Sequence, residues 1–430
     1  MNLVTRMKES FKQSSAFQHI VVYYLLTVII STVIVSLPFL HKDGVELPLI
    51  DALFTAITAI SVTGLTVISI SDTFIWILLG KKIGIRSRKM IMVDHNRKSL
   101  AGLVRLMLEI FVLILMIEAV GAILLTIHFL QYFETWKEAF LHGLFLSVSA
   151  TTNGGLDITG ASLIPYQHDY FVQIVTIILV ILGAIGFPVL IEVKDFIQHR
   201  IKNRRHRHRF SLFTKITTLT YFSLMIVGAV IIYLLEHNEF MADKAWHEAF
   251  FYSLFHSVAS RSAGLTTMDI SSFSMATLLF ISILMFIGAS PSSVGGGIRT
   301  TTFAIMLLAI WNFAKGHTSV KVFSREIHQD DIMRAFIVIS TALILCSSSV
   351  IILSFTENFT FLEIIFEVTS AFGTTGTSMG ITSDLSTIGK CVIMVLMFIG
   401  RIGIFTFLFI IRGDEIKDKY HYPTERVIIG

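Results

Sequence analysis

The amino-acid sequence predicts an all-α polytopic membrane protein, in which four pseudo-repeated units of span, pore helix and span surround a central pore. Apolar residues make up 54% of the 430-residue chain and charged residues only 15%, outside the usage of soluble domains. Four glycine-bearing segments also recur between apolar stretches, and repetition on this scale indicates duplicated structural units. They read Ser61-Val62-Thr63-Gly64, Thr152-Asn153-Gly154-Gly155, Arg261-Ser262-Ala263-Gly264 and Gly373-Thr374-Thr375-Gly376.

Long apolar stretches account for the predicted spans. A crossing helix needs roughly 20 predominantly apolar residues. A longer tract, Ser274–Ile310, is interrupted in its middle. The amino terminus lacks a short apolar region followed by a cleavage site, so no removable signal peptide is expected. The other spans are Ile20–Phe39, Val104–Leu130, Tyr170–Val193, Leu212–Leu235, Ile332–Leu353 and Ile388–Ile411.

Two basic linkers predict the orientation. Seven Lys and Arg residues fall between residues 81 and 98 and seven more between 194 and 209, whereas the segments just after the glycine motifs carry almost none. Positive residues stay on the cytoplasmic side, so the glycine motifs should open outward and both termini should be cytoplasmic. We interpret the linkers as topology anchors that contact anionic lipid, in preference to a nucleic-acid or metal site.

Each unit carries an acidic residue 13 to 17 positions before its aligned glycine, at the start of a short aromatic-rich helix. An acid there is stabilised by the helix dipole and caps free N–H groups, so capping is favoured over ion binding. A helix of about 10 to 13 residues is too short to cross; it should descend partway, with its carboxyl end aimed at the pore axis. The acids are Asp51, Glu138, Glu248 and Glu363.

The glycine segments are expected to return outward as extended backbone that lines the pore. Irregular backbone at membrane depth is tolerated only where it lines a watery cavity or is buried in protein. Glycine adopts unusual dihedrals and lets carbonyl groups face a central ion, and carbonyl rings can replace the hydration shell of potassium. The predicted filter, which would hold potassium through backbone carbonyls, comprises Val62, Thr63, Gly64, Asn153, Gly154, Gly155, Ser262, Ala263, Gly264, Thr374, Thr375 and Gly376.

With these motifs, the chain resembles the Trk/Ktr/HKT superfamily of potassium transporters, and most closely the membrane subunit of bacterial Ktr systems. One filter glycine per unit in that superfamily matches Gly64, Gly155, Gly264 and Gly376. Four glycines are typical of its potassium-preferring members. The resemblance implies a multi-pass plasma-membrane potassium pathway without a cofactor, with sodium as a candidate coupling ion. It also implies a homodimer and a separate cytosolic nucleotide-binding regulatory (RCK/KTN-type) subunit.

The interrupted tract is the predicted gate. It breaks at Gly288–Gly297, where Pro291 removes a helical hydrogen bond and the consecutive Gly295, Gly296 and Gly297 disfavour helix. One interpretation is an ordinary turn between two hairpin helices. The resemblance implies instead a gating loop inside the membrane, below the filter.

Arg401 is the second predicted gate residue. It stands within the last span, where a guanidinium is costly unless it faces a partner or a pore. The resemblance implies that it contacts the gating loop and forms part of the barrier. For Glu109 and Glu118, in the first span of unit two, a pore role and pairing with a base on another helix both stay open.

The first unit departs from the pattern, and its second span is expected to be missing. Successive aligned glycines are 91, 109 and 112 residues apart, and only the six apolar residues Phe74–Leu79 separate Gly64 from the first basic linker. Six residues cannot cross about 30 Å of hydrocarbon. An internal deletion is therefore favoured over an unusual repair. The expected units are residues 1–98, 99–209, 210–325 and 326–430, the last including a short cytoplasmic tail.

Two alternatives to a conducting subunit are considered. The missing span would be compatible with a non-conducting, internally deleted variant. A polytopic membrane enzyme is disfavoured, because the sequence has no His-Glu-x-x-His, no Gly-x-Ser-x-Gly and no acid–base pair clustered within the spans. No catalytic residues are predicted.

Overall fold

The computed structural model describes residues 16–37, 47–67, 103–201 and 209–412, with isolated positions in the carboxyl-terminal tail. Within these ranges nearly all regular structure is helical, which confirms the all-α class; the short hairpin of β1 (Lys321–Val322) and β2 (Arg325–Glu326) is the exception. The stretch Phe74–Leu79 and the basic linker at residues 81–98 lie outside the described residues, as do residues 202–208 of the second linker.

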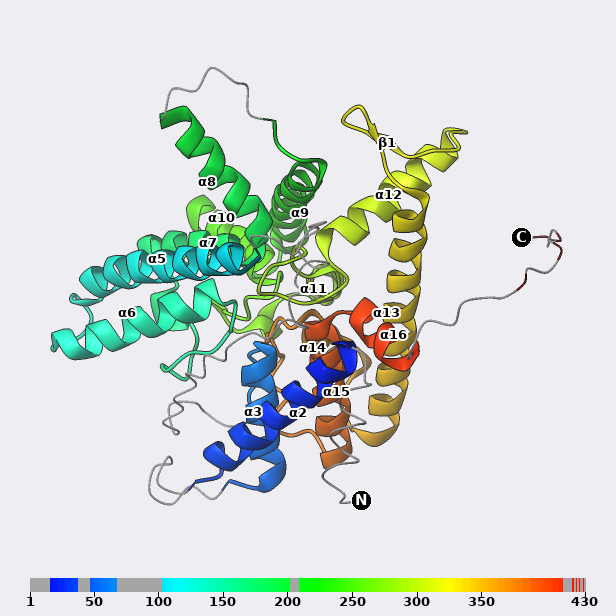
Figure 1. Cartoon of the computed structure of the whole chain (residues 1–430). Helices are drawn as coiled ribbons and strands as arrows, with labels where there is room; N and C mark the ends of the chain where they lie inside the picture. Colours follow the sequence, from blue (N-terminus) through cyan, green and yellow to red (C-terminus); the bar gives the residue numbers. More distant parts are fainter. Residues whose placement is uncertain are drawn as a thin grey trace, which may run out of the picture.

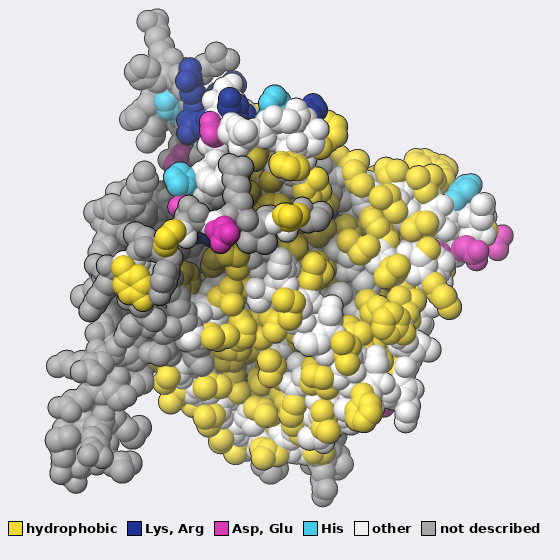
Figure 2. All heavy atoms as spheres, turned by 90° about the vertical axis from the view of Figure 1, so that its right-hand side faces the viewer, with side chains coloured by type: hydrophobic (Ala, Val, Ile, Leu, Met, Phe, Trp, Pro, Cys, Tyr) yellow, Lys and Arg dark blue, Asp and Glu magenta, His cyan; other side chains and the backbone are white. Residues whose placement is uncertain are grey.

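Long apolar helices lie where the sequence predicts the first spans of units two to four. Among the described residues three helices are long and apolar enough to cross a membrane, or up to four if one bent pair counts as a single span. The three occur within α5 (Leu103–Phe129), α9 (Leu212–Glu236) and α13 (Gln329–Thr356). Figure 2 shows hydrophobic side chains spread over one face of the molecule, as expected of a surface that lipid covers. The predicted first span of unit one, Ile20–Phe39, begins within α2 (Ala16–Val35), whose described apolar part is shorter than those three helices.

The second spans of units two to four are broken, and two of these breaks correct the sequence prediction. Helices α7 (Tyr170–Ala184) and α8 (Phe187–Ile201) meet at 104°, so Tyr170–Val193 is not one straight span. The last span divides at Gly403 into α15 (Thr387–Ile402) and α16 (Ile404–Arg412). The break between α11 (Met275–Ile287) and α12 (Thr300–Ala314) falls where the sequence predicts it. Hydropathy alone missed the other two breaks because, apart from Arg401, the residues around them are as apolar as the helices.

A positive-φ glycine lies in each break. The φ angles are 99° at Gly186, 69° at Gly288 and 83° at Gly403. This backbone region is open to glycine but disfavoured for residues with a Cβ. Each second span therefore changes direction at a residue that is suited to the turn.

Four short helices precede the glycine segments: α3 (Leu49–Ser61), α6 (Trp136–Thr151), α10 (Trp246–Ala259) and α14 (Phe361–Gly373). Each packs against the first span of its own unit, as α5 and α6 do in Figure 1. The 3-10 turns η3 (Ile164–Tyr166) and η4 (Ile270–Ser272) follow the second and third glycine segments. Capping is confirmed at two acids. Glu363 accepts the Thr360 N–H (2.7 Å) and Glu248 accepts the Ala245 N–H (3.2 Å).

In units two to four, buried or half-buried polar contacts join the end of the first span to the start of the second span. In units three and four a carboxylate accepts the N–H of the serine that caps the next helix, at 2.9 and 3.0 Å. In unit two the carboxylate lies instead at the start of the second span: Asp169 caps α7, and its Oδ2 lies 2.6 Å from Nε2 of His128 at the end of the first span. The same connection is thus built three times with different residues. The pairs are Glu236 with Ser274, Glu357 with Ser386, and His128 with Asp169.

Candidate functional site

The four aligned glycines lie against one another in a closed ring. A Cβ added to Gly64 would lie 2.6 Å from the Gly154 carbonyl oxygen and 3.0 Å from the Gly155 Cα atom. At the other end of the series, a Cβ on Gly376 would overlap the carbonyl oxygen of Thr63. The first segment therefore contacts both the second and the fourth.

The remaining contacts complete the ring. A Cβ on Gly155 would lie 3.0 Å from the Ala263 carbonyl oxygen, and one on Gly264 would overlap the carbonyl oxygen of Thr375. Real Cβ atoms do not approach backbone oxygens this closely, so a side chain at any of these positions would displace the neighbouring segment. Residues that are 91 to 112 positions apart in the sequence thus meet at one place.

The backbone of each segment repeats one unusual conformation. Positive φ occurs at the aligned glycine and again two residues before it. For the β-branched Val62 and Thr374 this region is rarely occupied, so the surrounding packing must hold it in place. The φ values are 52° and 91° for Val62 and Gly64, 52° and 63° for Asn153 and Gly155, 78° and 69° for Ser262 and Gly264, and 49° and 90° for Thr374 and Gly376.

Hydrogen bonds at the helix ends explain why the segments match. In units one and four the N–H of Thr63 and that of Thr375 donate to the carbonyl oxygens of Thr58 and Ser370, both at 2.8 Å. The hydroxyl groups of the same two residues accept the N–H groups of the aligned glycines, both at 3.1 Å. A hydroxyl six residues before the glycine therefore sets the start of the segment in both units.

The segment between α11 and α12 is packed against two of the glycine segments. The Gly296 N–H donates to the Ser262 hydroxyl at 3.0 Å. A Cβ on Gly296 would lie 2.6 Å from Thr374 Oγ1, and one on Gly295 would lie 2.5 Å from the Ser262 Cβ. The consecutive glycines thus occupy a place where side chains do not fit.

Hydrogen bonds from the same segment reach a second unit. The Ser290 N–H donates to the Ala184 carbonyl oxygen at 3.1 Å, and the Phe187 N–H donates to the Ser292 carbonyl oxygen at 2.9 Å. Ser290 and Ser292 are both buried. An ordinary hairpin turn would lie at the surface, so this geometry disfavours the turn interpretation.

Arg401 lies in the last turn of α15, next to this loop along the backbone. The Gly400 carbonyl oxygen, one residue before it, would be 3.0 Å from a Cβ on Gly296. Arg401 is half-buried and interacts electrostatically with Tyr24 of α2. The structure therefore brings the arginine and the glycine loop into the same region.

Several charged residues in the apolar core were missed or left undecided by the sequence analysis. Lys390 Nζ of α15 lies 2.6 Å from the Asp51 carboxylate of α3, so Asp51 forms an interhelical ion pair. Glu109 pairs with Lys194 of α8 at 2.8 Å, which favours the pairing alternative for that residue. A lysine inside an otherwise apolar span was the available signal for Lys390. Glu118 keeps both of its alternatives.

Arg261 and Glu367 are two further buried charged groups beside the ring. The Arg261 guanidinium is 1% exposed, lies 5.3 Å from the centroid of the Tyr221 ring, and has no hydrogen-bonding partner within the described ranges. Glu367 of α14 is fully buried and accepts the hydroxyl groups of Ser378 (2.7 Å) and Thr382 (2.5 Å). Its carboxylate thus ties the chain that follows the fourth glycine segment to the short helix.

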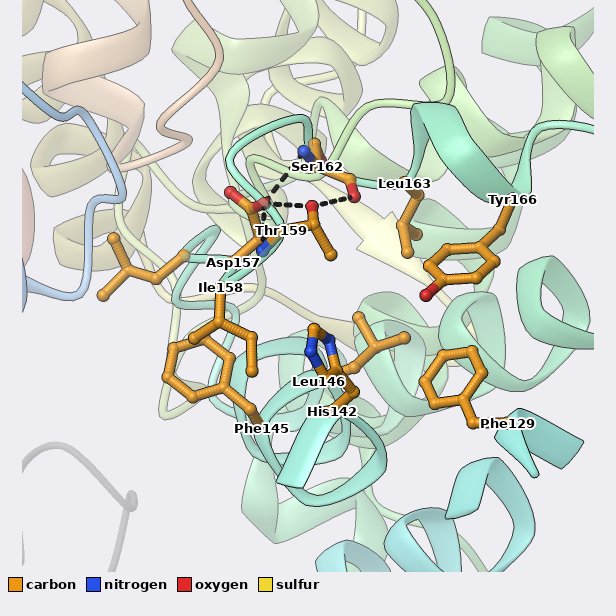
Figure 3. Close-up of a pocket in the computed structure, with 11 residues that line it drawn as sticks. Phe129, His142, Phe145, Leu146, Asp157, Ile158, Thr159, Ser162, Leu163 and Tyr166 are labelled. Carbon is orange, nitrogen blue, oxygen red and sulfur yellow. Dashed lines mark hydrogen bonds between the residues drawn. The ribbon is translucent and has the colours of Figure 1, made fainter. Parts of the chain in front are cut away.

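A small pocket lies beside the second glycine segment (Figure 3). Asp157, two residues after Gly155, accepts the N–H groups of Thr159 (3.1 Å) and Ser162 (3.0 Å) and closes a tight turn there. Aromatic and aliphatic side chains, including Phe129, form much of the remaining lining. The carboxylate is engaged by this turn, so we regard the pocket as a consequence of loop packing.

Comparisons with known proteins agree with this geometry. The family model described as cation transport protein TrkH matches residues 64–416. The Bacillus subtilis Ktr system potassium uptake protein D is 53% identical over 441 aligned positions, covering 97% of each chain. Protein B of the same system and organism is 33% identical, covering 96% of each chain. The potassium/sodium uptake protein NtpJ of Enterococcus hirae is 32% identical, covering 97% of this chain and 98% of its own.

A solved structure supports the fold. The potassium transporter TrkH from Vibrio parahaemolyticus superposes with a TM-score of 0.70 at 19% identity, covering 90% of this chain and 84% of that chain. The family model spans most of the chain and includes all four aligned glycines. The chain therefore belongs to the TrkH family of cation transport proteins.

Proposed function

We propose that the chain is the potassium-translocating membrane subunit of a Ktr-type uptake system, and that the ion crosses the glycine ring. The closed contact of four glycine segments is the observation that carries the proposal. The names of the 53% and 33% identical relatives point to potassium uptake. A transport function needs no catalytic residues.

Backbone carbonyl groups are the proposed potassium ligands. Alternating signs of φ turn successive N–H groups of a segment toward one side, which leaves the carbonyl groups on the other. Four such segments around one axis would present carbonyl rings that replace the hydration shell of the ion. The carboxyl ends of the four short helices add partial negative charge near the same place. The proposed filter residues are those predicted from the sequence, with potassium as the transported substrate.

The glycine loop and Arg401 are the proposed gate. The loop contacts two glycine segments through Gly295 and Gly296, and the backbone beside Arg401 contacts the loop. A positive charge near a narrow, poorly solvated path repels cations: at an effective dielectric constant of about 20, two charges about 4 Å apart interact by roughly 4 kcal/mol. Removal of either part should therefore raise ion flux.

The proposed architecture is four units, the first lacking its second span. Each remaining second span packs against the short helix of the next unit: α7 on α10, α11 on α14, and α15 on α3. By this rule α6 would receive the second span of unit one. Its residues Phe140, Leu144 and Val148, at helical spacing, are 45%, 36% and 37% exposed. The 441 positions aligned with the Bacillus protein also exceed the 430 residues of this chain, so that relative contains residues without a counterpart here.

The exposed face of α6 also supports the alternative function, a non-conducting variant of the subunit. Potassium uptake in a transport-deficient host distinguishes the two. Growth at low potassium that is lost on Gly264→Ser substitution would support conduction through the ring. Absence of growth despite correct insertion, with growth restored by the missing span, would support the non-conducting alternative.

The proposed setting is a multi-pass subunit of the cell membrane with both termini in the cytoplasm. A homodimer that binds a separate nucleotide-binding regulatory subunit would fit a Ktr system, for which the two Bacillus subtilis relatives are named. Contact of the basic linkers with anionic lipid is a further part of this proposal. Sodium as a coupling ion is another, because the Enterococcus hirae relative is named for both potassium and sodium. Co-purification with a regulatory subunit, and the mass of the detergent-solubilised complex, test the assembly.

A further inference from the structure

The hydroxyl group of Ser262, two residues before the ring glycine Gly264, joins three separate elements. It accepts the N–H of Gly296 in the loop at 3.0 Å and donates to the carbonyl oxygen of Gly373 at the end of α14, at 2.6 Å. Thr374 Oγ1 lies 3.3 Å away. A serine hydroxyl has one donor and two acceptor sites, so these contacts can form together. The group thus connects the third segment, the fourth segment and the loop.

The arrangement depends on the residue types that meet there. Gly295 and Gly296 lack side chains, and an added Cβ at Gly295 would fall 2.5 Å from Ser262. Val62, at the equivalent position in unit one, has no polar side-chain atom. Asn153, the equivalent in unit two, is buried with neither amide atom hydrogen-bonded within the described ranges. Thr374, the equivalent in unit four, has its hydroxyl 3.3 Å from that of Ser262. The hydrogen bond to the Gly296 backbone is made by Ser262, in the unit that also contains the loop.

We propose that Ser262 is a positioning residue that latches the intramembrane loop to the third and fourth glycine segments. Movement of the loop breaks the hydrogen bond from the Gly296 N–H to the Ser262 hydroxyl, while that hydroxyl remains bonded to the Gly373 carbonyl oxygen. The position of the loop and the geometry of the glycine segments are therefore linked through one oxygen atom. This inference rests on the proposed function of the loop as a gate, and it adds how the state of the gate is communicated to the filter.

The test compares the wild-type chain with Ser262→Ala and Ser262→Gly in lipid nanodiscs. Glycine removes the hydroxyl and suits the φ of 78° at this position, so it replaces the alanine variant if that variant fails to fold. Ser260→Ala is the matched control, because its buried hydroxyl donates to the Ser257 carbonyl oxygen (2.9 Å) within its own short helix. Amide hydrogen exchange of residues 288–299 is measured by mass spectrometry. Both Ser262 variants should exchange about fivefold faster there, as expected from losing one buried hydrogen bond, and the control should match wild type.

Potassium flux in proteoliposomes separates the latch from the gate. If deletion of Gly295–Gly297 raises flux, both Ser262 variants should also raise it, and Ser262→Gly should add nothing in the deleted background. If the deletion raises flux while the Ser262 variants change neither flux nor exchange, the latch is wrong and the gate stands. If the deletion leaves flux unchanged, the gate proposal fails; if the chain does not conduct, flux says nothing about the gate. In both cases the amide exchange rate alone decides the latch, and exchange at the wild-type rate in both Ser262 variants overturns the latch proposal.

Discussion

Substitution of a ring glycine by serine gives the sharpest test of the proposed filter. A Cβ at Gly376 would overlap the Thr63 carbonyl oxygen, and one at Gly64 would lie 2.6 Å from the Gly154 carbonyl oxygen. The φ angles of 90° and 91° add about 1–2 kcal/mol of strain for an L-residue. To relieve the overlap, a carbonyl group must shift by several tenths of an ångström. If such a shift removes about 1.4 kcal/mol of preference for potassium, potassium-over-sodium permeability falls about tenfold.

The assay is the permeability ratio of potassium to sodium in proteoliposomes. Gly380→Ser is the matched control, because Gly380 has a φ of 95° in the same unit but no atom within 4 Å of an added Cβ. Gly155→Ser should be milder than Gly376→Ser, since its nearest contact is 3.0 Å. Unchanged ratios for both Gly64→Ser and Gly376→Ser, in folded protein that still conducts, would refute the carbonyl-ring reasoning. Equal losses in Gly380→Ser would assign the effect to backbone strain.

Three further outcomes are expected. Arg401→Ala, and separately deletion of Gly295–Gly297, should raise potassium flux in proteoliposomes. Flux that stays constant or falls in both variants would indicate that Arg401 has a structural role and does not obstruct the ion. A segment of about 20 residues from the Bacillus protein D, inserted between Gly64 and the first basic linker, should make a cysteine at position 144, in place of Leu144, less accessible to a lipid-phase reagent. A cysteine in place of the exposed Ile127 is the control, and unaltered labelling at position 144 would contradict the missing-span proposal. Asp51→Asn or Lys390→Met alone should destabilise the fold by about 3 kcal/mol, seen as a lower melting temperature, because one charge of a largely buried pair is left uncompensated. The double variant should recover part of this loss. Strictly additive losses would argue against the pairing.

Local sequence patterns were sufficient to predict the class of the fold and the position of its main parts. Apolar length predicted the first spans, because a helix in hydrocarbon must satisfy its backbone internally over a fixed thickness. Glycine and proline predicted the break between α11 and α12, since both oppose helix formation wherever they occur. The acids Glu248 and Glu363 were interpretable as caps for the same reason: a cap acts on the turn that contains it.

Contacts between distant segments were decided only by the tertiary structure. Hydropathy does not encode direction, so it could not predict the bend between α7 and α8 or the division at Gly403. The partner of Asp51 lies 339 residues away, and a pair at that separation forms only after both helices have packed. The contacts that close the glycine ring have the same origin. The sequence contains four similar segments along the chain, whereas the packing of second spans on neighbouring short helices brings these segments together and places Ser262 against the loop.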